Sequence, residues 1–76
     1  MKVYVLKITD DEKEVTIHLF RKFENAIERV IKIQKEYDDS TEELLAEIRE
    51  SLEETNAWVD ELSEIEYEIV EKEFED

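Results

Sequence analysis

The sequence predicts a small α+β domain of two layers, an antiparallel sheet packed by two helices in the order β-β-α-α-β. Three observations predict it. Two runs at the amino end alternate with the period of two that is typical of strands, two central segments repeat hydrophobic residues every three or four positions as helices do, and alternation returns at the end. Seventy-six residues suit one domain, covering 1–76. A chain this short buries only about 60% of its unfolded surface, so we expect no deep substrate cavity.

The first two runs predict a β-hairpin. Residues 2–9 are rich in β-branched and aromatic types and place Val3 and Val5 on the face opposite Leu6. A polar turn over residues 10–13 follows. Residues 15–20 then alternate, with the hydrophobic side chains at positions 15, 17 and 19.

The first helix is expected from residue 23, where the hydrophobic period changes to about 3.6. Residues 21–35 hold half of the ten Lys and Arg residues of the chain, at Arg21, Lys22, Arg29, Lys32 and Lys35. Its hydrophobic stripe consists of Phe23, Ala26, Ile27, Val30, Ile31, Ile33 or Gln34, and Tyr37.

The second helix is predicted to start at Ser40, because Ser40 followed by Glu43 matches a capping box that contributes roughly 1 kcal/mol. Its hydrophobic seam begins with Leu45, Ile48 and Leu52. Two courses are open for residues 57–63. The seam allows the helix to continue past residue 60, whereas Asn56 allows it to stop early and turn.

A last strand is predicted over residues 64–74, because Ile65, Tyr67 and Ile69 alternate with glutamates. We expect it to lie as an edge strand beside the hairpin. A register shift near residues 69–70 would let Val70, Lys72 and Phe74 continue the pattern.

Charge is distributed unevenly along the chain. Ten Lys and Arg oppose 24 Asp and Glu, for a net charge of −14. Residues 1–37 hold eight cations and seven anions, whereas residues 38–76 hold two and seventeen. Such a field repels nucleic acid and anionic membranes and attracts basic surfaces over a Debye length of about 8–10 Å. Direct nucleic-acid binding is therefore not expected.

The sequence carries no recognisable catalytic or metal-site motif. The chain has no Cys and no Gly, which excludes disulfides, Cys-based zinc sites and glycine-rich phosphate loops. His18 is the single histidine and has too few partners for a metal site or a general base. We expect no enzyme activity, no metal and no cofactor. With no signal-like start and no membrane-length hydrophobic run, we expect a cytoplasmic protein.

The acidic second half holds the candidate partner-binding residues. Carboxylates recur at intervals of three to seven positions, which sets them about 5–6 Å apart in a row on a helix. Trp58 is either a core residue or the hydrophobic anchor of an acidic interface. The candidate set is Glu43, Glu47, Glu50, Glu54, Trp58, Asp60 and Glu61.

The run at residues 2–6, the second strand ending at Phe20 and the helix containing Ala26 together resemble small proteins encoded by phages and prokaryotic mobile elements, over about half the chain. In size and acidity the chain also resembles phage-encoded anti-CRISPR and anti-restriction DNA mimics. This resemblance implies an inhibitor in the host cytoplasm and assigns no residue a role.

These features lead to two hypotheses of different classes. In the first, the chain is an inhibitor whose acidic surface occupies the basic nucleic-acid-binding channel of a partner protein or complex. In the second, it is a structural or assembly module, a homodimer formed through the hairpin or the helix seam, whose acidity serves only solubility. Salt dependence of partner binding separates the two, because only the first relies on charge.

Overall fold

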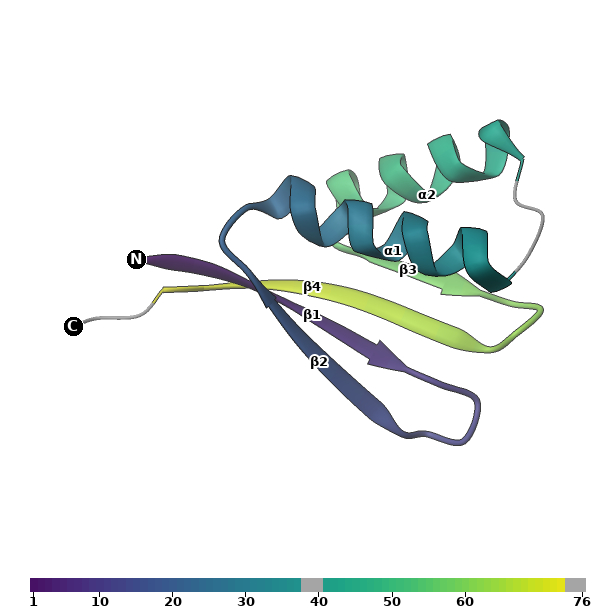
Figure 1. The fold of residues 1–76 in the computed structure, drawn as a ribbon, viewed down its shortest axis with the longest axis horizontal. Helices are drawn as coiled ribbons and strands as arrows, with labels where there is room; N and C mark the ends of the chain where they lie inside the picture. Colours follow the sequence, from purple (N-terminus) through teal and green to yellow (C-terminus); the bar gives the residue numbers. More distant parts are fainter. Residues whose placement is uncertain (38–40, 74–76) are drawn as a thin grey trace.

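The computed structural model describes residues 1–37 and 41–73, and within them a four-stranded antiparallel sheet is covered on one face by two helices (Figure 1). The elements are β1 (Lys2–Thr9), β2 (Val15–Phe20), α1 (Phe23–Tyr37), α2 (Glu42–Thr55), β3 (Ala57–Asp60) and β4 (Ile65–Glu73). The strand order across the sheet is β2-β1-β4-β3. The predicted α+β architecture is confirmed, with one short strand, β3, added before the last.

The β1–β2 hairpin forms as predicted, in continuous register from Tyr4 opposite Phe20 to Thr9 opposite Val15. The carboxylate of Asp10 shapes its turn by accepting the backbone N–H groups of residues 12 and 14, each at 2.9 Å. Because the chain has no glycine, ordinary residues must take left-handed backbone where turns require it. They are Lys13, Asn56 and Glu64, with φ of 70°, 61° and 58°.

Both ends of α2 are fixed by polar residues. The N-cap is Thr41, whose side chain accepts the N–H of Leu44 at 3.2 Å. The predicted cap, Ser40, is therefore wrong by one position and itself lies outside the described residues. At the other end Asn56 turns left-handed and donates its N–H to the carbonyl of Leu52 at 3.0 Å. The helix stops there, so the longer helix is wrong, and residues 57–60 form β3.

The last strand, β4, is an interior strand between β1 and β3, so its predicted place at an edge is wrong. Its pairing with β1 runs unbroken from Lys2 opposite Glu73 to Thr9 opposite Glu66. The predicted register shift is also wrong, because unbroken alternation puts Val70 on the face away from the helices. Phe74, the last member of the shifted pattern, lies outside the described residues.

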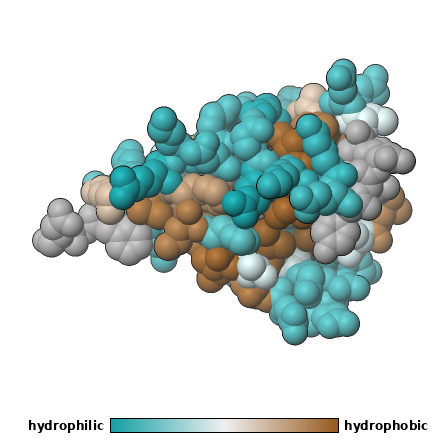
Figure 2. Space-filling view, in the orientation of Figure 1, coloured by the Kyte–Doolittle hydropathy of each residue, from teal (hydrophilic) through white to brown (hydrophobic). Residues whose placement is uncertain are grey.

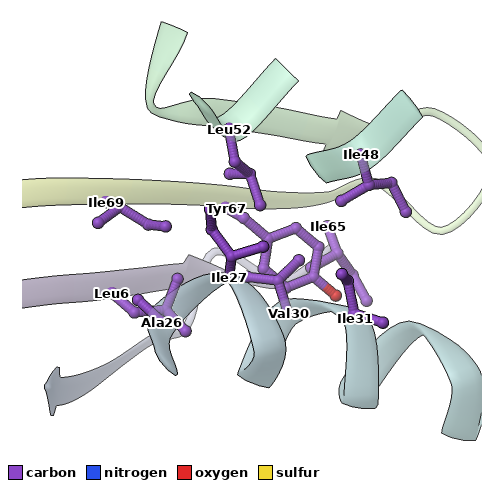
Figure 3. Packing of buried hydrophobic residues seen from close by; sticks show 10 residues of the cluster. All are labelled: Leu6, Ala26, Ile27, Val30, Ile31, Ile48, Leu52, Ile65, Tyr67 and Ile69. Carbon is purple, nitrogen blue, oxygen red and sulfur yellow. The ribbon is translucent and has the colours of Figure 1, made fainter. Parts of the chain in front are cut away.

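The core lies between the helices and one face of the sheet (Figure 3). Its buried members are Leu6, Ala26, Ile27, Val30, Ile31, Ile48, Leu52, Ile65, Tyr67 and Ile69. Tyr67 is only 1% exposed, accepts a hydrogen bond from Nε2 of the buried Gln34 at 2.8 Å, and stacks on Trp58 with ring centroids 6.0 Å apart. One β4 side chain therefore links α1, the core and β3. The predicted stripe of the first helix is confirmed, except that the side chain of Tyr37 lies outside the described residues.

The alternation along β2 places its hydrophobic side chains on the exposed face of the sheet. Its hydrophobic side chains, Val15, Ile17 and Leu19, are all exposed, while His18 and Phe20 on the other face are partly buried. No described helix lies on the face that carries the first three, because both helices cover the opposite side of the sheet (Figure 1).

Replacing Tyr67 with Phe should lower the free energy of unfolding by about 1–2 kcal/mol, because the amide of Gln34 loses an acceptor inside the core. Tyr4→Phe is the matched control, since its hydroxyl bonds to Glu71 at an exposed position and its loss should cost less than about 0.5 kcal/mol. Urea denaturation measures both. Equal losses in the two variants would contradict the role given to the buried hydrogen bond.

Candidate protein-binding surface

The outer side of α2 carries a row of exposed carboxylates, called here the acidic stripe. It consists of Glu43, Glu47, Glu50 and Glu54. The members are three or four residues apart, so they lie on one helix face and span about 16 Å at a rise of 1.5 Å per residue. The buried residues of α2, Ile48 and Leu52, point to the opposite side. All four residues lie in a row on α2, as their spacing in the sequence predicted.

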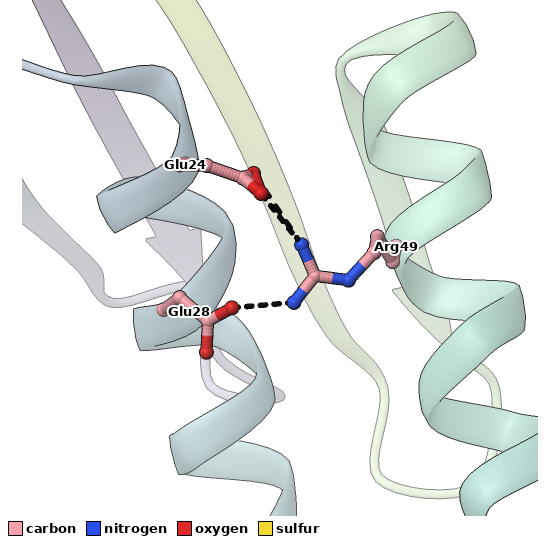
Figure 4. Close-up of polar contacts among 3 residues, drawn as sticks. All are labelled: Glu24, Glu28 and Arg49. Carbon is pink, nitrogen blue, oxygen red and sulfur yellow. Dashed lines mark hydrogen bonds and ion pairs between the residues drawn. The ribbon is translucent and has the colours of Figure 1, made fainter.

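The single cation of α2, Arg49, is turned away from the acidic stripe and toward α1 (Figure 4). Its Nη1 lies 3.0 Å from a carboxylate oxygen of Glu24, and its Nη2 contacts Glu28. The hydrogen bond that Arg49 donates to Glu28 is the main reason that the pKa of Arg49 is raised. The guanidinium therefore ties the two helices together and neutralises α1 instead of α2.

As a result the acidic stripe has no counter-charge of its own. Among residues 1–37 and 41–73, the ion pairs are those of Arg49 and one between Lys2 and Glu71. The remaining residues, 38–40 and 74–76, include no Lys or Arg. Like charges at these helical spacings cost a few tenths of a kcal/mol per pair. That repulsion is relieved when a basic surface approaches.

The short strand β3 sets further candidate residues beside α2. The Oγ of Ser51 donates to the carbonyl of Ala57 at 2.7 Å and so holds the start of β3 against the end of the helix. Trp58 lies opposite Tyr67 in the strand register and stacks on it. The indole is half-buried, so Trp58 is at once the border of the core and part of the surface.

A shallow groove of about 340 Å³ runs between α2 and β3, called here the α2–β3 groove. Its lining residues are Gln34, Leu44, Glu47, Trp58, Val59, Asp60, Glu61 and Leu62. Leu62 is 92% exposed, which is unusual for a large hydrophobic side chain. Hydrophobic side chains and carboxylates together suit an Arg or Lys, whose aliphatic stem packs on the former while its charge meets the latter.

Asp60 supplies a fixed negative charge within this groove. Its carboxylate accepts the backbone N–H of Leu62 at 3.1 Å. Partial burial acts to raise its pKa, but the Ser63 hydroxyl, the N–H groups of residues 62 and 63 and the Gln34 amide outweigh burial and lower the pKa. The Ser63 Oγ is buried and makes no hydrogen bond of normal geometry in the described part of the chain.

The structure gathers part of the predicted set. Glu47, Trp58, Asp60 and Glu61 meet in the α2–β3 groove. The other three members of the acidic stripe extend along α2 outside it. Glutamates 66 and 68 of β4, in contrast, lie on the opposite face of the sheet and do not join the stripe.

Four lining residues, Gln34, Leu44, Val59 and Leu62, were not in the predicted set. Leu62 reads as one more position of the helical seam, and only the stop at Asn56 moves it to a turn. Leu44 became a groove residue because β3 packs beside α2, a long-range contact that leaves no local pattern. The exposure of Leu62 could be inferred only once the end of α2 was known.

Neither a metal-ligand cluster nor a membrane-spanning helix is found among the residues that the structure describes. They contain no group of three or more His, Asp or Glu side chains that could hold a metal ion. None of their helices is long and hydrophobic enough to span a membrane. No family of known proteins, curated protein sequence or solved structure matches this chain.

Stability should depend on the charge of Asp60 in a pH-dependent way. Because its pKa is lower in the folded protein than its ordinary value of 3.8, the carboxylate stabilises the fold fully above about pH 4 and loses this effect as the pH falls through the lowered value. Asp60→Asn should therefore be less stable than the matched control Glu61→Gln, which removes the same charge from an exposed neighbour.

Thermal denaturation of both variants at neutral pH and at about pH 2.5 measures this. We expect the gap between their melting temperatures to shrink at the lower pH. A gap that is unchanged across this range would contradict the stabilising role of the Asp60 carboxylate.

Proposed function

We propose that this protein is an inhibitor that presents the acidic stripe and the α2–β3 groove to the basic nucleic-acid-binding channel of a partner, as anti-CRISPR or anti-restriction DNA mimics do. The observation that carries the proposal is the row of four helix carboxylates with no cation paired to it in the described residues. The one Arg that could have neutralised it is used on α1.

The length and spacing of the row support this proposal. A duplex carries one phosphate for about every 3.4 Å of axis on each strand. Over the roughly 16 Å of the acidic stripe, four carboxylates stand where about five phosphates would. A channel lined with Lys and Arg for a nucleic-acid backbone would meet a similar density of negative charge.

The α2–β3 groove would add selectivity to this attraction. Charge alone brings any basic surface near and speeds association, whereas a stable complex needs a desolvated contact. Trp58 and Leu62 offer hydrophobic area next to Glu47 and Asp60. Aromatic residues in such positions are enriched among those that contribute most binding energy. The proposed contact therefore has a charged row and one hydrophobic anchor.

The experiment that tests the proposal is affinity capture from a cell lysate with the purified chain immobilised. We expect it to retain a nucleic-acid-binding protein that elutes with rising salt and is displaced by duplex DNA. Displacement by DNA is the decisive result, because it indicates competition for the nucleic-acid-binding channel, whereas elution by salt indicates only that charge contributes to binding. Retained proteins that DNA does not displace would contradict mimicry.

Reversing three charges of the acidic stripe, as in Glu47→Lys/Glu50→Lys/Glu54→Lys, should weaken capture of the DNA-displaceable partner by at least about tenfold, which corresponds to 1.4 kcal/mol. The matched control is Glu66→Lys/Glu68→Lys/Glu73→Lys, which changes net charge equally but lies on β4, away from the stripe. Circular dichroism would verify that both variants fold.

The control should retain most of its binding, because its three positions do not line the proposed contact. Equal losses in the two triple variants would mean that overall charge and not the acidic stripe determines capture.

A further inference from the structure

The strand β2 forms an unprotected edge of the sheet. It pairs with β1 alone among the described strands, so the backbone N–H and C=O groups on its other side are open. Edge strands usually carry a Lys, a Pro or a bulge that prevents pairing with another chain. None of these interrupts Val15–Phe20, whereas the opposite edge, β3, has only four residues and ends in Asp60.

The same strand exposes a hydrophobic row. Val15, Ile17 and Leu19 are 49%, 60% and 65% exposed on the uncovered face of the sheet. The row extends inward, because Leu19 lies opposite Val5 and Val5 lies opposite Val70. Figure 2 shows hydrophobic residues gathered on the side of the molecule where Figure 1 places β1 and β2.

The charges at the two ends of β2 identify the partner. Glu12 and Glu14 precede the strand, and Arg21 and Lys22 follow it. A second β2 strand running antiparallel would set the acidic end of one copy beside the basic end of the other, twice. A parallel strand would set like charges together. Each β2 strand has both an acidic end and a basic end, so a second copy of this chain supplies the complementary charges by symmetry.

We propose that two copies of this protein dimerise by antiparallel pairing of their β2 strands about a twofold axis perpendicular to the sheet, giving one continuous eight-stranded sheet. About such an axis, one residue of β2 lies opposite the same residue of the second copy. That residue is either Ile17 or His18. In both registers the exposed rows of the two copies join on one face, since residues directly opposite point to the same side.

The negative charge of the chain does not oppose this dimer. The two β3 strands lie at the far ends of the joined sheet, seven strand spacings apart, or about 34 Å at roughly 4.8 Å each. The Debye length at physiological salt is about 8 Å, so the acidic halves scarcely interact. The dimer leaves the acidic stripe free in both copies and does not depend on the function proposed for it.

Sedimentation equilibrium of the wild-type chain should give twice the 9.2 kDa chain mass. Ile17→Lys should raise the dimer dissociation constant by at least about tenfold, because it places a charge in the joined hydrophobic row. The matched control, Val59→Lys, changes an exposed Val on the opposite edge strand and should stay dimeric. A monomeric wild type, or equal masses for the two variants, would overturn the proposal.

Reversing the charges at one end of β2 tests whether the flanking charges contribute to the pairing. Glu12→Lys/Glu14→Lys and Arg21→Glu/Lys22→Glu should each dimerise poorly alone, because each sets like charges together. Mixed, they should form a heterodimer with opposite charges at both ends. No preference for the mixed species would overturn the role of the flanking charges in the dimer.

Because the chain has no cysteine, one introduced thiol gives a clean cross-link. Ile17→Cys or His18→Cys should form a disulfide dimer under mild oxidation, since a residue paired with its own copy places its Cα atoms about 4.5–5.5 Å apart, within disulfide range. Val59→Cys should remain a monomer on non-reducing gels. Cross-linking of neither β2 variant, or of Val59→Cys to the same extent, would overturn the proposed axis.

Discussion

The position of Tyr67 in β4 is the constraint on which the rest of the structure depends. Its ring fills the space between the sheet and both helices, its hydroxyl accepts from Gln34 of α1, and its face stacks on Trp58 of β3. Because side chains alternate between the two faces of a strand, burial of Tyr67 in the core places Glu66 and Glu68 on the solvent-exposed face. The Trp58 stack fixes β3 to β4, and the hydrogen bond from Ser51 to Ala57 holds β3 beside α2, so these two contacts together form the α2–β3 groove.

A sheet covered on one face only explains how so acidic a chain can fold. The uncovered face and the outer sides of the helices give the carboxylates of these elements access to solvent. Among residues 1–36 and 41–73, Gln34 is the one buried polar residue. Charge is therefore arranged by surface: Arg49 joins α1 to α2, the acidic stripe is left without a cation, and β2 is left without any charge. The two proposed contacts use these last two surfaces separately.

Local periodicity was enough to predict the hairpin, α1, the start of the acidic row and the existence of the last strand. It failed where the structure of a segment depends on the strand with which it pairs. β3 is only four residues long, and Val59 and Leu62 fit a helical seam as well as a strand, so only the left-handed Asn56 separates the two. The register of β4 depends on eight successive pairs with β1, which no local pattern near Val70 reveals. The glutamates of the site were predictable from spacing. Of its hydrophobic lining only Trp58 was predicted, because Leu44, Val59 and Leu62 line the groove through long-range packing.

Hydrogen exchange of the chain, alone and bound to the DNA-displaceable protein that it captures, tests the central claim most directly. Backbone amides report protection over each element separately. Binding through the acidic stripe and the α2–β3 groove predicts slower exchange over residues 42–62, with residues 15–20 unchanged on complex formation. Protection confined to residues 15–20, with α2 and β3 exchanging as in the free protein, would contradict the account.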